Sequence, residues 1–205
     1  TARGEVLGVV GASGAGKSLT GAAIIGLLEP PGRIAAGEVR LEGLRIDNLR
    51  YDDLRKIRGR EIGAIFQDPL TSLNPLYTVG QQIVETITTH LNISTGKARE
   101  RAVELLLATG IPAAERRIDH YPHQFSGGMR QRVVIALALA AQPKLVIADE
   151  PTTALDVSIQ AQIIALLKRL CREQGTAVML VTHDMGVIAE TADRVAVMYA
   201  GRIAE

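Results

Sequence analysis

A glycine-rich segment, residues 11–18 (GASGAGKS), most constrains the fold of this 205-residue chain. It follows the apolar run 6–10 and precedes a helical pattern over 17–28, so the chain passes from a buried strand through a tight glycine turn into a helix. Further apolar runs predict strands buried on both faces, as in a parallel sheet: residues 145–148, 177–181 and 195–199. Helical patterns lie between these runs. We therefore expect an α/β fold with a mostly parallel sheet.

Two segments depart from this alternation. Residues 38–47 (EVRLEGLRID) alternate polar with apolar side chains, which predicts a half-exposed antiparallel hairpin at the edge of the sheet. Residues 69–125 contain helical patterns with no strand pattern between them, which predicts an all-helical insertion subdomain. We expect one domain over residues 1–205, with a core at about 1–68 and 126–205.

Composition narrows the possible partners. The net charge is +1, from 23 Lys and Arg against 22 Asp and Glu, so no nucleic-acid partner is expected. Cys171 is the only cysteine, which excludes an internal disulfide and is typical of a reducing compartment.

The apolar run 133–141 is too short to span a bilayer, so a role at the membrane needs a partner. The chain begins without Met and enters a strand almost at once, so we expect a fragment of a longer protein.

The glycine-rich segment fits the phosphate-binding pattern G-x-x-x-x-G-K-[ST] in its strand-to-helix context, which predicts a P-loop NTPase core. Glycines let backbone N–H groups surround phosphates, and the dipole of the following helix adds positive potential. Lys17 should contact the β- and γ-phosphates, and the Ser18 hydroxyl should bind Mg²⁺. The alternative is a glycine turn with no ligand. The expected phosphate-binding residues are Gly11, Ser13, Gly14, Ala15, Gly16, Lys17 and Ser18.

The apolar run 145–148 ends in two carboxylates, Asp149 and Glu150. In a parallel sheet this end lies close to the end of the strand before the phosphate loop. Asp149 is then placed to hold Mg²⁺, and Glu150 to orient an attacking water or accept its proton. An exposed acidic strand end without chemistry is the alternative.

Four further features share the chain with these two motifs: Gln67 after the apolar residues 64–66, the FSGGM motif at 125–129, the triplet 154–156 (ALD), and His183 after the run 177–181. In this order and spacing the motifs resemble those of the nucleotide-binding domain of ATP-binding cassette proteins, over almost the whole chain. The resemblance implies that the nucleotide is ATP, with Mg²⁺.

The resemblance also implies roles for single residues. Gln67 is expected to contact Mg²⁺ and the attacking water and to link the core to the helical insertion, so the metal site comprises Ser18, Gln67 and Asp149. His183 is expected to read the γ-phosphate and support Glu150, which makes Glu150, His183 and Gln67 the catalytic set. Taken alone, Gln67 would be a solvated glutamine at a strand end and His183 a structural histidine.

Ser126, Gly127 and Gly128 form a second potential anion site, because Ser126 can cap a helix whose first N–H groups are free. A glycine-capped helix start is the alternative. In the family two cassettes meet head to tail, so the resemblance implies that this signature motif contacts the ATP of a second cassette subunit. Asp156 is then expected near the dimer axis.

Three longer stretches resemble the peptide/nickel branch of bacterial importer ATPases: residues 65–75, 123–132 and 148–156. This implies an ATP-hydrolysing subunit that powers import of peptides or related small solutes through transmembrane permease subunits, peripheral to the cytoplasmic face of the membrane. The alternative is a soluble ABC-type ATPase acting in DNA repair or translation.

Residues 1–10 hold no aromatic side chain to stack on adenine, and the chain lacks the C-terminal extension usual in the branch. We therefore expect a cassette truncated at both ends, with weak or no ATPase activity in isolation.

Overall fold

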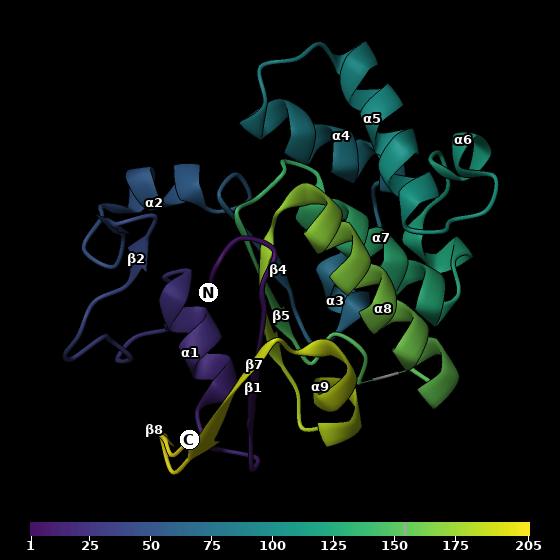
Figure 1. Cartoon of the computed structure of the whole chain (residues 1–205). Helices are drawn as coiled ribbons and strands as arrows, with labels where there is room; N and C mark the ends of the chain where they lie inside the picture. The colour runs from purple at the N-terminus through teal and green to yellow at the C-terminus, as the bar shows by residue number, and fades with distance from the viewer. Residues whose placement is uncertain (154) are drawn as a thin grey trace.

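The computed structural model describes residues 1–153 and 155–205 (Figure 1). Ala154, which belongs to the predicted 154–156 motif, lies outside the described residues. The main sheet has six strands in the order β4-β5-β6-β1-β7-β8. Its strands are β1 (Val6–Gly11), β4 (Ile62–Ile65), β5 (Leu145–Asp149), β6 (Ala177–Val181), β7 (Arg194–Tyr199) and β8 (Arg202–Ile203).

Across the sheet, the neighbouring strands β4, β5, β6, β1 and β7 pair in parallel, and β8 adds an antiparallel edge strand. All five residues of β6 are buried, as the continuous apolar run predicts for a strand covered on both faces. Successive strand residues alternate between two apolar clusters, so Val178 and Leu180 face one cluster while Met179 and Val181 face the other. The predicted α/β class and mostly parallel sheet are confirmed.

Helices cover both faces of this sheet (Figure 1). Helix α1 (Lys17–Ile24) lies on one face, and α7 (Gly127–Leu139) and α8 (Val157–Gln174) lie on the other, with α9 (Met185–Thr191) beside β1. The predicted first helix ends earlier than residue 28. Gly26 adopts φ +67°, and the N–H of Leu27 donates to the carbonyl of Ala22, which closes the helix.

The predicted hairpin forms, but it is not part of the main sheet. Strands β2 (Arg40–Leu41) and β3 (Leu44–Arg45) pair antiparallel as a separate two-stranded sheet, and the antiparallel edge strand of the main sheet is β8 instead. The reason is that the apolar side of the hairpin packs against side chains: Ile46 is buried in the cluster on the α1 face. Its backbone is therefore not presented to the edge of the large sheet.

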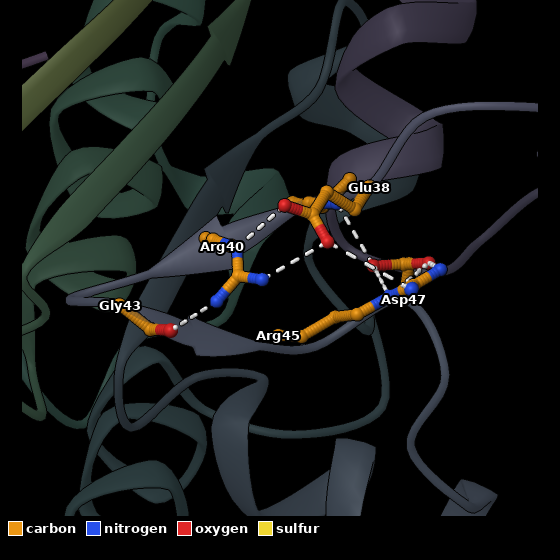
Figure 2. A network of polar contacts seen from close by, with 6 residues as sticks. Glu38, Arg40, Gly43, Arg45 and Asp47 are labelled. Carbon is orange, nitrogen blue, oxygen red and sulfur yellow. Dashed lines mark hydrogen bonds and ion pairs between the residues drawn. The ribbon is translucent and has the colours of Figure 1, made fainter.

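Charged side chains hold the hairpin together (Figure 2). Arg40 donates to Glu38 (2.6 Å) and to the carbonyl of Gly43 (2.9 Å). Arg45 donates to Asp47 (2.8 Å), which also accepts from the backbone N–H of Val39 (2.8 Å). Asp47 therefore ties the two ends of the hairpin to each other. Helix α2 (Tyr51–Ile57) follows it.

Between β4 and α7 the described residues form only helices and loops. The helices are α3 (Pro69–Ser72), α4 (Val79–His90), α5 (Thr95–Ala108), α6 (Ala114–Arg117) and the 3₁₀ helix η1 (Pro122–Gln124). Helices α4 and α5 pack through buried aliphatic side chains and lie at one end of the molecule in Figure 1. A division of the chain into a core and an insertion at residues 69–125 stays a prediction. Among the described residues, no helix combines the length and apolar character needed to cross a bilayer.

Candidate active site

The carboxyl ends of three parallel strands meet at one edge of the sheet. Strand β5 ends at Asp149, which is in register with Val181 at the end of β6, and Val181 is in register with Val9 of β1. A cavity of about 600 Å³ opens at this edge. Its lining residues come from four separate segments: Ser13, Gly14, Gly16, Lys17, Ser18, Leu19, Gln67, Glu150, Thr153 and His183. Ligand sites in open α/β sheets occupy this position.

The phosphate loop requires its glycines. Gly14 and Gly16 adopt φ +77° and +97°, which side-chain-bearing residues rarely do. A Cβ atom on Gly11 would lie 2.1 Å from the carbonyl oxygen of Met198, so the loop packs directly on β7. Helix α1 begins after Gly16 with no side-chain cap, which leaves its first N–H groups for a ligand.

Lys17 lies over this loop. It is 7% exposed, and its Nζ donates to the carbonyl oxygens of Gly11 (2.8 Å) and Ala12 (3.0 Å). These bonds fix the ammonium at the mouth of the loop, beside the free N–H groups of the helix. The arrangement suits an anionic group, because one positive charge and several backbone donors face the same cavity.

Ser18 and Asp149 form the second part of the site. The Ser18 hydroxyl donates to Asp149 Oδ1 at 3.0 Å, although 131 positions separate them in sequence. Burial raises the pKa of Asp149, and the hydrogen bond from Ser18 acts in the opposite direction. A hydroxyl and a carboxylate are oxygen ligands of the type that Mg²⁺ prefers, and Mg²⁺ sites commonly use one or two carboxylates with substrate phosphates. No cluster of three or more His, Cys, Asp or Glu that could hold a metal occurs in the described part of the chain.

Glu150 lies at the centre of a polar network. Its Oε1 is 3.1 Å from His183 Nδ1, and its Oε2 accepts hydrogen bonds from Gln67 Nε2 (3.1 Å) and Thr153 Oγ1 (2.9 Å). Burial raises the pKa of Glu150, but the hydrogen bonds from His183 and Thr153, together with the electrostatic effects of His183 and Lys17, bring its pKa below the ordinary value. Glu150 is therefore an ionised, oriented carboxylate at neutral pH, which is the state that a general base requires.

Thr153 is the functional residue that sequence reasoning missed. It lines the cavity and donates to Glu150. The stretch 148–156 that carries the resemblance contains Thr153, but no role was expected for its hydroxyl. The signal was a hydroxyl residue three positions after Glu150. In a turn this spacing brings a side chain back to the first residue.

The signature residues and Asp156 lie outside the cavity. Ser126 caps α7, where its hydroxyl accepts from the N–H of Met129 at 3.4 Å, and a Cβ on Gly128 would lie 3.0 Å from Ile159 of α8. Asp156 precedes α8, is exposed and makes no side-chain cap. The structure thus brings together the phosphate loop, Asp149, Glu150, Gln67 and His183. It does not bring residues 126–128 or Asp156 to the same cavity.

Comparison with known proteins decides the relationship. The family model described as "ABC transporter" matches residues 1–153 of the 205. The chain belongs to the ABC transporter family. The fold agrees with solved cassettes of this family: it superimposes with a TM-score of 0.85 and 36% identity on the structure titled "Dimeric structure of a post-hydrolysis state of the ATP-binding cassette MJ0796 bound to ADP and Pi", covering 99% of this chain and 84% of that one.

Two curated relatives have names that assign them to peptide transport. The chain is 57% identical over 204 residues to the oligopeptide transport ATP-binding protein OppD of Bacillus subtilis, covering 99% of this chain and 57% of that relative. It is 51% identical over 203 residues to the dipeptide transport ATP-binding protein DppD of Escherichia coli, covering 99% of this chain and 62% of that relative. The predicted resemblance to the peptide branch is confirmed. The chain spans only about three fifths of the length of these relatives.

Proposed function

We propose that this chain is the ATP-binding and ATP-hydrolysing unit of an importer of peptides or related small solutes. The observation that carries the proposal is the cavity in which the phosphate loop meets the Glu150–His183 pair, with Asp149 bonded to Ser18 of the loop. A phosphate-binding loop alone would support nucleotide binding. The adjacent ionised carboxylate, held by three side chains, supports hydrolysis as well.

Each residue has a role in this proposal. Lys17 and the N–H groups at the start of α1 bind and orient the β- and γ-phosphates of ATP. Mg²⁺ would be held by Ser18 and Asp149, with Gln67 as a further oxygen ligand, and supplies charge neutralisation of the phosphates when bound. Glu150 accepts the proton of the water that attacks the γ-phosphorus, and inorganic phosphate and ADP are the products. His183 holds Oε1 of Glu150.

A second cassette subunit completes the site in this proposal. Ser126, Gly127 and Gly128 form a capped helix start with N–H donors, but they do not line the cavity of their own chain. A head-to-tail dimer would bring them to the γ-phosphate bound by the partner, with Asp156 near the axis. The solved cassette MJ0796 is described as dimeric.

The output of hydrolysis is proposed from the relatives. Their names assign them to oligopeptide and dipeptide transport, so transmembrane permease subunits are the expected partners and the cytoplasmic face of the membrane the expected location. No feature of the described residues favours a soluble ATPase in DNA repair or translation.

Peptide uptake tests this function. In cells that lack the gene for the full-length subunit, the wild-type gene should restore uptake of labelled di- and oligopeptides, and a Lys17→Ala variant should not. Lys97→Ala is the matched control, because Lys97 is exposed on α5 and outside the cavity. Uptake that is restored equally by Lys17→Ala, or ATPase activity with no effect on peptide uptake, would overturn the proposal.

A further inference from the structure

The Thr153 hydroxyl contacts Glu150 from within the same turn of the chain. Its Oγ1 donates to Glu150 Oε2 at 2.9 Å, and it lies 3.2 Å from the carbonyl oxygen of Glu150. The backbone N–H of Thr153 also reaches that carbonyl at 3.3 Å. We propose that Thr153 is a positioning residue that fixes which oxygen of Glu150 receives the proton of the attacking water. This inference rests on the proposed ATP hydrolysis.

The hydrogen bonds divide the two oxygens of Glu150 into different roles. An ionised carboxylate has about two lone-pair positions on each oxygen. Oε2 accepts from both Thr153 and Gln67, so its positions are filled. Among the described residues, Oε1 has one polar contact, with His183, which leaves one position for a water. The oxygen beside His183 is therefore the one placed to act as the base.

Thr153 and Gln67 do not hold Oε2 equally firmly. Gln67 follows β4, at 83 positions from Glu150, and it is also the amide expected to contact Mg²⁺. Its position relative to Glu150 therefore depends on the packing of a separate strand. Thr153 is three residues away, and its backbone is already bonded to the carbonyl of Glu150. Thr153 therefore anchors Oε2 through a local turn that does not depend on the strand carrying Gln67.

The backbone of Glu150 makes this anchor necessary. Glu150 adopts φ +44°, a left-handed conformation that non-glycine residues seldom take and that must be held by surrounding contacts. The hydroxyl of Thr153 has one hydrogen and two acceptors within reach. The carboxylate is both nearer and charged, so it takes the stronger bond, while the N–H maintains the turn.

Three variants of the full-length subunit test the proposal. Thr153→Val keeps the shape and removes the hydroxyl, and Thr153→Ser keeps the hydroxyl. Thr88→Val is the control, since within the described residues the Thr88 hydroxyl donates to carbonyls of its own helix α4 alone. Thr153→Val should lower the kcat of ATP hydrolysis about tenfold at unchanged KM and unchanged ATP affinity, because orientation of the base is lost while the phosphate loop is intact. Thr153→Ser should restore at least half of the wild-type kcat.

The possible results distinguish failure of the Thr153 positioning role from failure of the proposed ATP hydrolysis. Unchanged kcat in Thr153→Val, or a kcat in Thr153→Ser as low as in the valine variant, would overturn the positioning role while leaving ATP hydrolysis intact. A wild-type protein that binds ATP and Mg²⁺ but does not hydrolyse ATP would overturn the proposed function itself, and the positioning role with it. If Thr153→Val unfolds, Thr153→Ala is measured in its place. A crystal structure of the folded variant should show the carboxylate of Glu150 turned away from His183, and an unmoved carboxylate would contradict the proposal.

Discussion

Replacement of Glu150 by glutamine separates hydrolysis from ATP binding. The amide has the same shape as the carboxylate. Its oxygen can accept from Thr153 and Gln67, and its nitrogen can face His183, so the network in the cavity is retained. What is lost is the ionised acceptor that the lowered pKa of Glu150 provides.

The magnitude follows from this loss. General-base catalysis contributes about 10²- to 10⁴-fold to a rate, which corresponds to about 3–5 kcal/mol of transition-state stabilisation. We therefore expect the Glu150→Gln substitution to reduce kcat by a factor of about 10² to 10⁴. The affinity for ATP should stay within about a factor of three, because Lys17 and the phosphate loop are unchanged.

Steady-state ATPase rates and equilibrium binding of ATP to the full-length subunit measure these two quantities. Glu173→Gln, an exposed change on α8, is the control and should leave both unchanged. A Glu150→Gln variant with wild-type turnover would refute the assignment of Glu150 as base. Loss of ATP affinity with unchanged kcat would show that Glu150 serves only in binding.

Two further predictions concern stability. Asp47→Asn should lower Tm above about pH 4, and the difference from wild type should shrink as the pH falls to 2. The Arg45 side chain and the Val39 N–H lower the pKa of Asp47 from 3.8 to about 2, so this carboxylate stabilises the fold fully above its ordinary pKa and loses the effect as the pH falls through the folded-state value. Thermal melts across this range measure it, and an equal Tm difference at pH 2 and pH 7 would contradict it. Gln131→Met should raise the unfolding free energy by about 1–3 kcal/mol in urea titrations, because Nε2 and Oε1 of this buried amide have no hydrogen-bond partner among the described residues. A less stable variant would show that the amide is satisfied.

Much of the fold could be predicted because parallel strands buried on both faces leave continuous apolar runs. The run 177–181 became β6 with the same bounds, and the glycine-rich segment became a strand, loop and helix. The predicted placement of the hairpin at the sheet edge was wrong. Alternation of polar and apolar residues shows that one side of a hairpin is buried, but it does not show which element buries it. Residues 38–47 alternate for packing on side chains of the core, not for pairing with an edge strand.

Some features of the candidate site could also be predicted from the sequence, and others could not. The ends of β1, β5 and β6 had to meet at one edge, so the approach of Ser18 to Asp149 follows from a parallel sheet. The contact of Thr153 with Glu150 depends on the left-handed backbone at Glu150, which no sequence pattern revealed. The empty hydrogen-bonding positions of Gln131 depend on the packing around α7, which is likewise absent from local sequence.

A structure of the full-length Glu150→Gln subunit with ATP and Mg²⁺ tests most directly whether the site is shared between two subunits. We predict a dimer in which the phosphates of each ATP contact residues 11–18 of one copy and Ser126, Gly127 and Gly128 of the other. An ATP enclosed by a single copy, with Ser126 touching no phosphate of either nucleotide, would contradict the account.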